Sequence, residues 1–567
     1  MRLSLLLAAA APLALLCACA TAPAGSGSGP GPTALAANVS PYGMFLAGES
    51  ALNNGRSGDA ARFFDQARTE TGDAMIGEKA FTAALLAGDI QKASALAPVG
   101  DDASEAGKRL GKLVVAVEAM ADGKGKEAKA LLAGDSIAFP HKSAAALLAP
   151  WAAAEAGDVE GSLVRPQVRG DRLVDYFGQL GQAALYERAK RNDEAETDFK
   201  ALVSVANPTE MAVLAYGGFL ERRGRKVDAL ALYGEQLARE PDSTAAKAAQ
   251  ARASAGKPAP PMPTLREGAA QALLAPSATM IAAKQTQLAL AYLRLILRLD
   301  PDRDEAWVMV GDLMQGAGDV DGARAAYGHP KPGSMEYPAA QAKLAWSYQN
   351  AEDKETALKL ARTAAAGGGF DARVTLADLL RSDEQYPEAV QVLSGLIADS
   401  KTPDWRLLYS RGVAYERMNR WPEAQADLQA ALKLRPDEPE LLNYLGYSWI
   451  DRGEHLAEAR AMIEKAVAAD PRSGAMVDSL GWAFYRMGDY KQAVEKLEQA
   501  VELEAGDPEI NNHLGDAYWK VGRKDEAQFQ WRRVLTLKPD NKIKASAEAK
   551  LASGLGPDGP TPKLAGS

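Results

Sequence analysis

The residue types that most often carry catalysis or bind metals are sparse in this chain of 567 residues. Its two cysteines, Cys17 and Cys19, lie within the first twenty residues, so the remainder has no thiol nucleophile, thiolate ligand or internal disulfide. The four histidines are His141, His329, His455 and His513. They are scattered and form no metal-binding spacing such as HxxxH. We therefore expect no metal, no cofactor and no catalytic group, and a chain that is not an enzyme.

The charged and glycine-rich stretches suggest neither a reaction nor a nucleic-acid partner. Gly367-Gly368-Gly369 joins two helical patterns, so it lacks the context of a phosphate-binding loop. The chain has 65 basic and 74 acidic residues, a net charge of −9, and no block of lysine and arginine. Nucleic-acid binding depends on such a basic surface. Hydrophobic residues make up 47% of the chain, and the many alanines among them favour closely packed helices.

Between residues 405 and 539 one pattern of small and large residues occurs four times. Successive copies begin roughly 34 residues apart. Each copy has a glycine in its first half, namely Gly412, Gly446, Gly481 and Gly515. An alanine follows each glycine: Ala424, Ala493 and Ala527 after twelve residues, and Ala459 in the second copy after thirteen. The second copy therefore has one residue inserted in the turn around Gly453 to His455.

This pattern predicts two antiparallel helices in each copy, which we call helix A and helix B. The glycine and the alanine are small because they lie where helix A touches its own helix B. The large residues between them fill the gap to the next copy. Pro436, Pro471 and Pro539 end helix B in three of the copies. Since one hairpin cannot bury its apolar face alone, the copies must stack into a solenoid.

The four copies resemble the tetratricopeptide repeat (TPR), and looser copies of the pattern extend back to Tyr42. The resemblance implies an all-α fold, a TPR α-solenoid in which roughly 12–14 helical hairpins form a superhelix. It also implies a concave groove for peptides, because fixed positions of helix A face inward in this family.

By this resemblance ten side chains line the groove: Tyr409, Arg417, Asn443, Tyr447, Trp482, Tyr485, Arg486, Asn512, Trp519 and Lys520. Exposed aromatic side chains without a binding role would be energetically costly. An amide can hold a bound backbone through both its donor and its acceptor, and the basic side chains can pair with carboxylates. The alternative is that the aromatic rings pack against helices of the next turn. The Lys and Asn pair of the family's chaperone-binding clamp is not present in these copies.

The first residues have the layout of a secretory signal peptide, with a short basic start and an apolar run up to Leu16 that is too short for a permanent membrane span. Leu16-Cys17-Ala18-Cys19 resembles the lipobox of bacterial lipoproteins. The resemblance implies that residues 1–19 are a lipoprotein signal peptide and that Cys19 carries a lipid anchor. Ala20 after it, rather than aspartate, implies an outer-membrane lipoprotein that faces the periplasm. The alternative is an ordinary secretory signal.

Composition divides the remainder. Residues 20–36, rich in glycine, proline and serine, predict a flexible tether. Residues 37–253 predict a degenerate N-terminal TPR-like solenoid, residues 264–552 a C-terminal TPR solenoid, and residues 553–567 a disordered tail. Residues 254–263 hold four prolines and predict a Pro-rich linker, which we place between two solenoid segments. The alternative is an irregular loop between adjacent hairpins.

The layout of the whole chain resembles TPR lipoproteins that serve as adaptors of carboxyl-terminal processing proteases. This implies a membrane-anchored interaction scaffold of the bacterial cell envelope that presents peptidoglycan hydrolases or other clients to a periplasmic protease. The partners would be peptides or helical segments of other proteins, without nucleic acid. A scaffold for exopolysaccharide export or outer-membrane assembly is the alternative, and the sequence leaves a homodimer open. The repeats leave no space for a catalytic domain.

Overall fold

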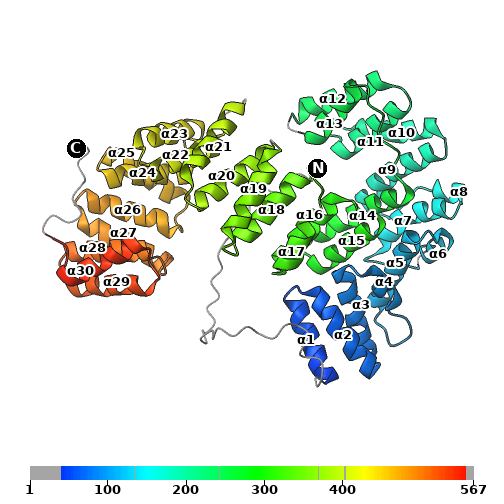
Figure 1. Ribbon diagram of the computed structural model, residues 1–567, viewed down its shortest axis with the longest axis horizontal. Helices are drawn as coiled ribbons and strands as arrows, with labels where there is room; N and C mark the ends of the chain where they lie inside the picture. Colours follow the sequence, from blue (N-terminus) through cyan, green and yellow to red (C-terminus); the bar gives the residue numbers. More distant parts are fainter. Residues whose placement is uncertain (1–39, 135, 242, 368, 401–403, 557–567) are drawn as a thin grey trace. The chain divides into compact units, whose positions relative to one another are not determined.

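The computed structural model describes residues 40–134, 136–241, 243–367, 369–400 and 404–556, which form 30 α-helices and no strand (Figure 1). The predicted signal peptide, Cys19 and the predicted tether lie outside these ranges, as does most of the predicted tail. Within them, no helix has the length and apolar character that a bilayer span requires. The prediction of an all-α repeat fold is confirmed.

The chain divides into two units, residues 1–347 and 348–567. The first unit holds the helices α1 (Pro41–Asn53), α2 (Ser57–Thr71), α3 (Ala74–Ala87), α4 (Ile90–Ala95), α5 (Glu105–Ala121), α6 (Gly125–Leu131), α7 (Lys142–Glu155), α8 (Val159–Ser162), α9 (Arg172–Arg188), α10 (Asn192–Val203), α11 (Glu210–Arg222), α12 (Lys226–Arg239), α13 (Thr244–Ser254), α14 (Leu265–Ala282), α15 (Thr286–Leu299), α16 (Asp304–Gly316), α17 (Val320–Tyr327) and most of α18 (Tyr337–Gln349). The second unit holds α19 (Lys354–Ala366), α20 (Phe370–Ser382), α21 (Tyr386–Asp399), α22 (Trp405–Arg417), α23 (Trp421–Leu434), α24 (Pro439–Arg452), α25 (Leu456–Ala469), α26 (Gly474–Arg486), α27 (Tyr490–Leu503), α28 (Pro508–Lys520), α29 (Lys524–Thr536) and α30 (Asn541–Ser553).

The predicted packing of helix A on helix B is present in the hairpins α22/α23, α24/α25, α26/α27 and α28/α29. A Cβ added at Gly481 would lie 2.6 Å from Leu497 Cγ, and one at Gly515 would lie 2.5 Å from Trp531 Nε1. These distances leave no room for a methyl group, so a larger residue would push the two helices apart. The small residues therefore set the spacing within each hairpin.

The turns between the two helices follow from local residues. In three of the hairpins the turn contains one residue with a positive φ, namely Asn419, Gly488 and Gly522 in chain order. In α24/α25 two residues do so, Gly453 with φ 74° and His455 with φ 46°. This pair accommodates the inserted residue that the sequence predicts there.

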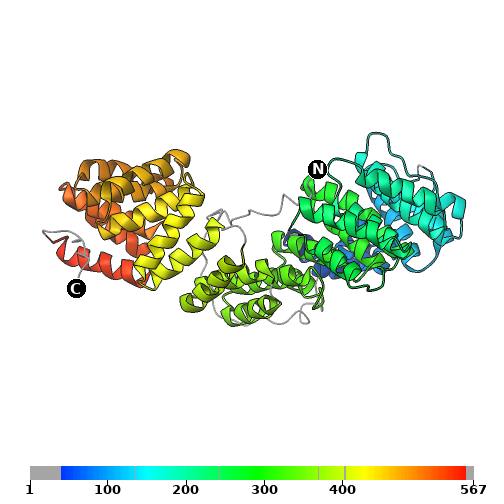
Figure 2. The ribbon, with the colours of Figure 1, turned by 90° about the horizontal axis from the view of Figure 1, so that it is seen from above.

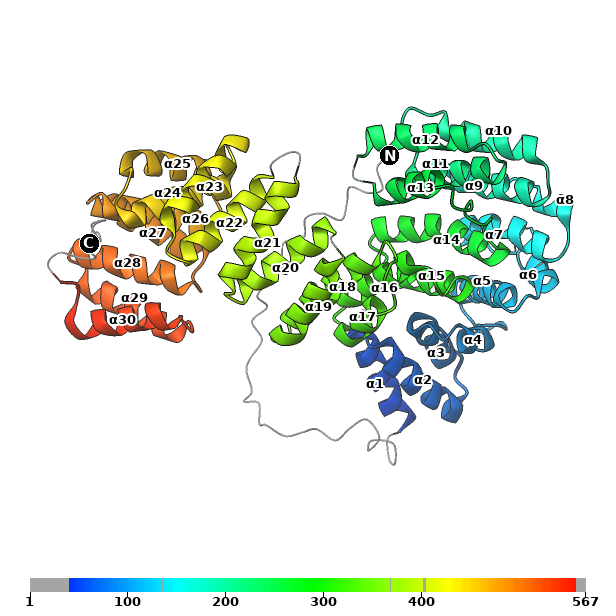
Figure 3. The same cartoon turned by 45° about the horizontal axis from the view of Figure 1, so that its top comes forward.

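In the first unit, the hairpin α14/α15 folds back onto much earlier helices. Helix α14 packs on α7 and α9, and α15 packs on α3, α4 and α5, as the central position of both helices in Figures 1 and 3 illustrates. One continuous apolar core joins residues 81–185 to residues 269–327. Ten of the fourteen residues of α15 are buried. The inner side of α3 to α9 is therefore filled by the chain itself.

Polar contacts over long sequence distances accompany this core. Arg298 of α15 donates to both carboxylate oxygens of Glu118 on α5, at 2.7 and 2.9 Å. Tyr292 Oη lies 2.8 Å from His141 Nδ1, and both side chains are buried. Burial lowers the pKa of His141 to about 4, so this imidazole is neutral at physiological pH.

The proline-rich stretch 254–263 lies inside the first unit, because the helices on both of its sides belong to that unit. The division between the units falls instead within α18, between Ser347 and Tyr348. The sequence predicted a boundary at residues 254–263 because prolines end helices. Prolines do not report whether the following helices pack back onto earlier ones, as α14 does here.

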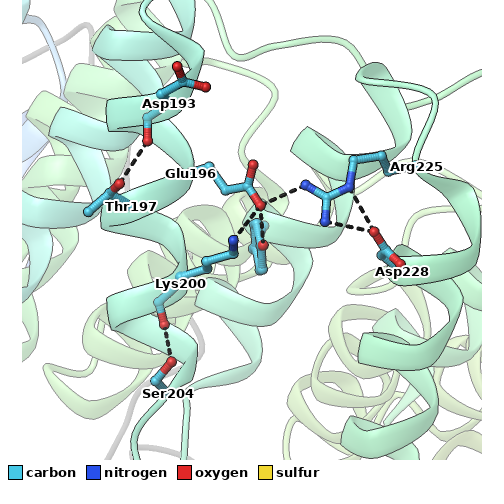
Figure 4. Close-up of polar contacts among 8 residues, drawn as sticks. Asp193, Glu196, Thr197, Lys200, Ser204, Arg225 and Asp228 are labelled. Carbon is cyan, nitrogen blue, oxygen red and sulfur yellow. Dashed lines mark hydrogen bonds and ion pairs between the residues drawn. The ribbon is translucent and has the colours of Figure 1, made fainter.

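A charged cluster connects α10 with α12 in the same unit, and Figure 4 shows its geometry. Glu196 lies between Lys200, at 2.8 Å, and Arg225, at 2.6 Å. Arg225 also pairs with Asp228 at 2.7 Å, so it serves two carboxylates. The hydrogen bonds from Lys200 and Arg225 lower the pKa of Glu196 to about 2.

The second unit ends with α30, the red helix in Figures 1 and 2. It packs on α28 and α29, where the helix A of a further repeat would otherwise lie. Its one buried residue is Ala547, and its opposite side is polar. This composition suits the end of a solenoid, where one face of the last helix meets water.

Candidate functional site

The ten predicted groove residues lie on α22, α24, α26 and α28, the helix A of four successive repeats. Helix α24 packs on α26, α26 on α28, and α28 on α30. A side chain on the inner side of one helix A can therefore either meet the next helix A or remain open to a ligand. The structure separates the predicted residues into these two groups.

Trp482 and Tyr485 belong to the first group, because their exposed fractions are only 5% and 4%. Their rings stack at 4.7 Å, and Trp482 also stacks on His513 of α28 at 4.1 Å. The prediction that these two rings lie open in a groove is therefore wrong. Adjacent A helices approach closely enough for the indole to fill the space between them.

A buried ion pair lies beside this stack and was not predicted from the sequence. His513 Nδ1 lies 3.0 Å from Asp478 Oδ2, and both residues are buried. Burial alone would lower the pKa of His513, but the carboxylates of Asp478, Glu509 and Asp516 raise it overall. The sequence shows His513 as one of four histidines, but it does not indicate the partner Asp478, because this residue belongs to the preceding repeat.

Asn512 is also buried, 8% exposed, and its amide is used within the chain. Lys550 of α30 donates to Asn512 Oδ1 at 2.9 Å and to Asp516 Oδ2 at 2.8 Å. Trp531 Nε1 donates to Asp516 Oδ1 at 3.0 Å. The prediction that Asn512 offers an open amide to a ligand is wrong, because the residue is buried and its amide oxygen is already bound by Lys550.

Four more predicted residues contact the protein itself. Tyr447 donates to Glu509 at 3.2 Å, which connects α24 to α28. Arg486 donates to the carbonyl oxygen of Asp451 at 2.9 Å, and its side chain is only 7% exposed. Trp519 packs on Trp531 at 5.3 Å. Lys520 Nζ lies 5.9 Å from the ring of Tyr490.

The remaining three, Tyr409, Arg417 and Asn443, lie on α22 and α24 and are more open. The side chain of Arg417 is 62% exposed, and Tyr409 is half-buried with its ring 5.4 Å from that of Tyr444. Asn443 Oδ1 is buried and has no hydrogen-bond partner. With the exposed residues Arg406 and Glu440, these residues form what we call the α22–α24 face.

Other polar atoms in the described part of this unit are also buried without a partner, among them Trp482 Nε1 and Tyr485 Oη. Buried polar groups are nearly always hydrogen-bonded, so such atoms mark positions where water or a ligand completes the structure. Like Asn443, both come from helix A. Among the described residues there is no group of three or more His, Cys, Asp or Glu side chains that could hold a metal ion.

Three models of one repeat family match this part of the chain. One, described as TPR repeat, matches residues 481–522, and two, described as tetratricopeptide repeat, match residues 409–474 and 508–541. All three lie in the second unit.

Among curated proteins, the TPR repeat-containing protein PA4667 of Pseudomonas aeruginosa is 35% identical over 141 residues, which are 25% of this chain and 23% of that protein. A probable UDP-N-acetylglucosamine–peptide N-acetylglucosaminyltransferase, SPINDLY, from Hordeum vulgare is 24% identical over 168 residues, which are 30% of this chain and 18% of that protein. The chain thus spans under a quarter of the length of both relatives.

Two solved structures are similar to parts of this chain at low TM-scores. The APC/C hetero-tetramer Cut9–Hcn1 is similar over 90% of this chain and 96% of that chain, with 15% identity and a TM-score of 0.38. MamA from Desulfovibrio magneticus RS-1 is similar over 30% of this chain and 94% of that chain, with 21% identity and a TM-score of 0.27. The family matches and the helical hairpins together identify residues 409–541 as tetratricopeptide repeats.

Proposed function

We propose that this protein is a membrane-anchored scaffold that binds other proteins through the α22–α24 face. Tetratricopeptide repeats expose extended surfaces that suit protein–protein interaction. The observation that supports the location is the unpaired Oδ1 of Asn443, which lies on the same face as the exposed Arg417. The Asn443 side chain is only partly buried, so a change of its rotamer can bring the amide oxygen to the surface, where it accepts a backbone N–H from a bound segment. Arg417 can pair with a carboxylate.

The chemistry of this face favours a peptide or helical segment that carries an acidic group near an accessible backbone N–H. Tyr409 and Tyr444 offer a half-buried aromatic pair against which an apolar side chain can pack. Glu440 is exposed on the same face and would repel a second acidic group. A ligand with one carboxylate near Arg417 therefore fits better than a strongly acidic tail.

Site-specific crosslinking tests this location. A photoreactive residue in place of Tyr409 should yield crosslinked partners from envelope extracts. The same residue in place of Phe529, 59% exposed on α29, serves as the control. Asn443→Ala should reduce the yield at Tyr409, because it removes the unpaired acceptor. Equal yields at both positions, or an undiminished yield with Asn443→Ala, would show that the α22–α24 face is not the binding surface.

We further propose that Cys19 carries a lipid anchor that holds the protein at the outer membrane facing the periplasm, and that its clients include peptidoglycan hydrolases delivered to a carboxyl-terminal processing protease. The support is the lipobox pattern and the likeness of the chain's layout to such adaptors. Cys19→Ser should release the protein from the membrane fraction, whereas Cys17→Ser should leave it anchored. Release by Cys17→Ser alone would place the lipid on the other cysteine. Recovery of neither a protease nor a hydrolase with the intact protein would remove the adaptor role.

A further inference from the structure

The segment between α13 and α14 has a backbone constrained by its own sequence. Residues 257–263, which we call the proline-rich segment, read Lys-Pro-Ala-Pro-Pro-Met-Pro. The four prolines have φ fixed near the polyproline II value, and the residues that precede a proline disfavour the helical region. The segment therefore favours an extended or polyproline II conformation. The structure accordingly shows no helix or strand there. None of these residues is fully buried.

Two arginines of earlier helices hold this segment by its backbone. Arg222 Nη1 donates to the carbonyl oxygen of Pro260 at 3.0 Å, and Arg188 Nη2 donates to that of Pro263. Arg222 is oriented by Glu187, which accepts two hydrogen bonds from it at 2.8 Å each. A Cβ added at Gly218 would lie 3.1 Å from Pro260 Cγ, so the proline ring packs closely on α11.

The spacing of the two bound carbonyls fits one turn of a polyproline II helix. Arg188 and Arg222 are the last residues of α9 and α11, and the carbonyls that they bind are three residues apart. Three residues of polyproline II make one turn and rise about 9 Å. Packed helices lie about 8–10 Å apart. One turn of polyproline II therefore covers about the distance between two packed helices, so the Pro260 and Pro263 carbonyls can each meet an arginine at the end of its own helix.

Polar atoms without a hydrogen-bond partner also lie at the end of α7, beside an open space. A hollow of about 680 Å³ is lined by Glu155, Arg188, Met262, Thr264, Leu265 and Arg266. Glu155 is the last residue of α7, and its Oε2 is buried without a partner, as is Nε of Arg188. Burial raises the pKa of Glu155. The ends of α7, α9 and α11 thus offer more hydrogen-bonding capacity than the chain's own segment uses.

We propose that the ends of α7, α9 and α11 form a binding site for extended proline-rich segments, that residues 257–263 occupy this site in cis, and that a proline-rich segment of a partner protein competes with them. Both arginines recognise backbone carbonyls, so any segment with the same backbone conformation makes the same contacts. The cis segment is covalently attached and acts at an effective concentration on the order of millimolar. It therefore weakens the apparent affinity for a partner segment. This site lies in the first unit and is independent of the α22–α24 face.

A labelled synthetic peptide with the sequence of residues 255–266 tests the site by fluorescence anisotropy against the full chain. Pro260→Ser with Pro263→Ser weakens the cis segment and should raise the affinity for the peptide about tenfold or more. Arg188→Ala in that background should remove the gain, because it deletes the donor to the second carbonyl. Gly218→Ala should also reduce it, because the added Cβ would lie 3.1 Å from Pro260 Cγ and 3.2 Å from Arg222 Nη1. Arg223→Ala, an exposed neighbour on the same turn, is the matched control and should leave the gain intact.

Two results would overturn the proposal. The first is an unchanged affinity when the cis segment is weakened in a protein whose helical circular dichroism matches that of the wild type. The second is equal binding of a control peptide in which every proline is replaced by glycine. That control retains the charges and the length but loses the constrained backbone. Binding of it would mean that charge, rather than the extended conformation, is recognised.

Discussion

Removal of the Lys550 side chain should destabilise the last repeat, because Asp516 would lose its counter-charge. Asp516 is 2% exposed and lies 2.8 Å from Lys550 Nζ. Loss of one partner of a buried ion pair typically costs about 3–5 kcal/mol. Two features reduce that value here: the Lys550 side chain is 14% exposed, so water can enter, and Trp531 Nε1 still donates to the carboxylate. We expect Lys550→Ala to cost about 2–3 kcal/mol at pH 7.

The cost should depend on pH in a defined direction. Burial raises the pKa of Asp516 above its usual value, although Lys550 partly offsets this, and loss of the lysine should raise it further. The folded state then holds the proton of Asp516 more tightly than the unfolded state does. Protonation therefore stabilises the fold, and stability falls as the pH rises from about 4 through the folded pKa. The deficit of Lys550→Ala should be smaller at pH 4.5 than at pH 7.

Hydrogen exchange of the amides in α28, α29 and α30 measures this local opening free energy. Lys544→Ala, an exposed lysine on the same helix, is the control. Asp516→Asn combined with Lys550→Ala should recover at least about 1 kcal/mol relative to Lys550→Ala, because no charge is then left buried. A protection loss below about 0.5 kcal/mol at pH 7 for Lys550→Ala would refute the argument from the buried charge.

Three further predictions concern other parts of the chain. Gly481→Ala should lower stability by about 1–3 kcal/mol in denaturant titrations, because its Cβ would lie 2.6 Å from Leu497 Cγ, whereas Gly506→Ala, with no atom within 4 Å of its Cβ, should have little effect. His513 has a raised pKa, so its ion pair with Asp478 contributes stability that is complete below about pH 6.5 and is lost as the pH rises through the folded pKa. His513→Gln should abolish this loss in melting curves taken at pH 6 and pH 9. An unchanged pH dependence in the variant would contradict the prediction. Glu118→Gln should weaken the contact of α15 with α5 by about 1–3 kcal/mol and speed hydrogen exchange in α14 and α15. Glu127→Gln, on the exposed side of α6, should change neither quantity. Equal exchange in both variants would show that the apolar core alone holds α15 in place.

The candidate site was predicted only in part, and the reason is geometric. Repeat spacing correctly places all ten candidates on helix A of four repeats. Whether a helix A side chain faces a ligand or the next helix depends on the angle between neighbouring repeats, which no single repeat encodes. That angle buries Trp482 against His513 but leaves Arg417 exposed. The alternative that the aromatic rings pack against helices of the next turn holds for Trp482, which stacks on His513 of α28. The ring of Tyr485 packs on Trp482 and on Tyr490 of its own hairpin.

The sequence by itself determined the features that depend on contacts within one hairpin. Gly481 meets Leu497 sixteen residues later, and His455 takes the positive φ that an inserted turn residue requires, so spacing and turn chemistry are sufficient to predict them. Only the tertiary structure decided which hairpins meet again. Arg298 reaches Glu118 across 180 residues, and Lys550 reaches Asn512 from the end of the solenoid. Such contacts depend on the small rotations between successive repeats, which add up along the chain. A periodic sequence does not specify the total rotation.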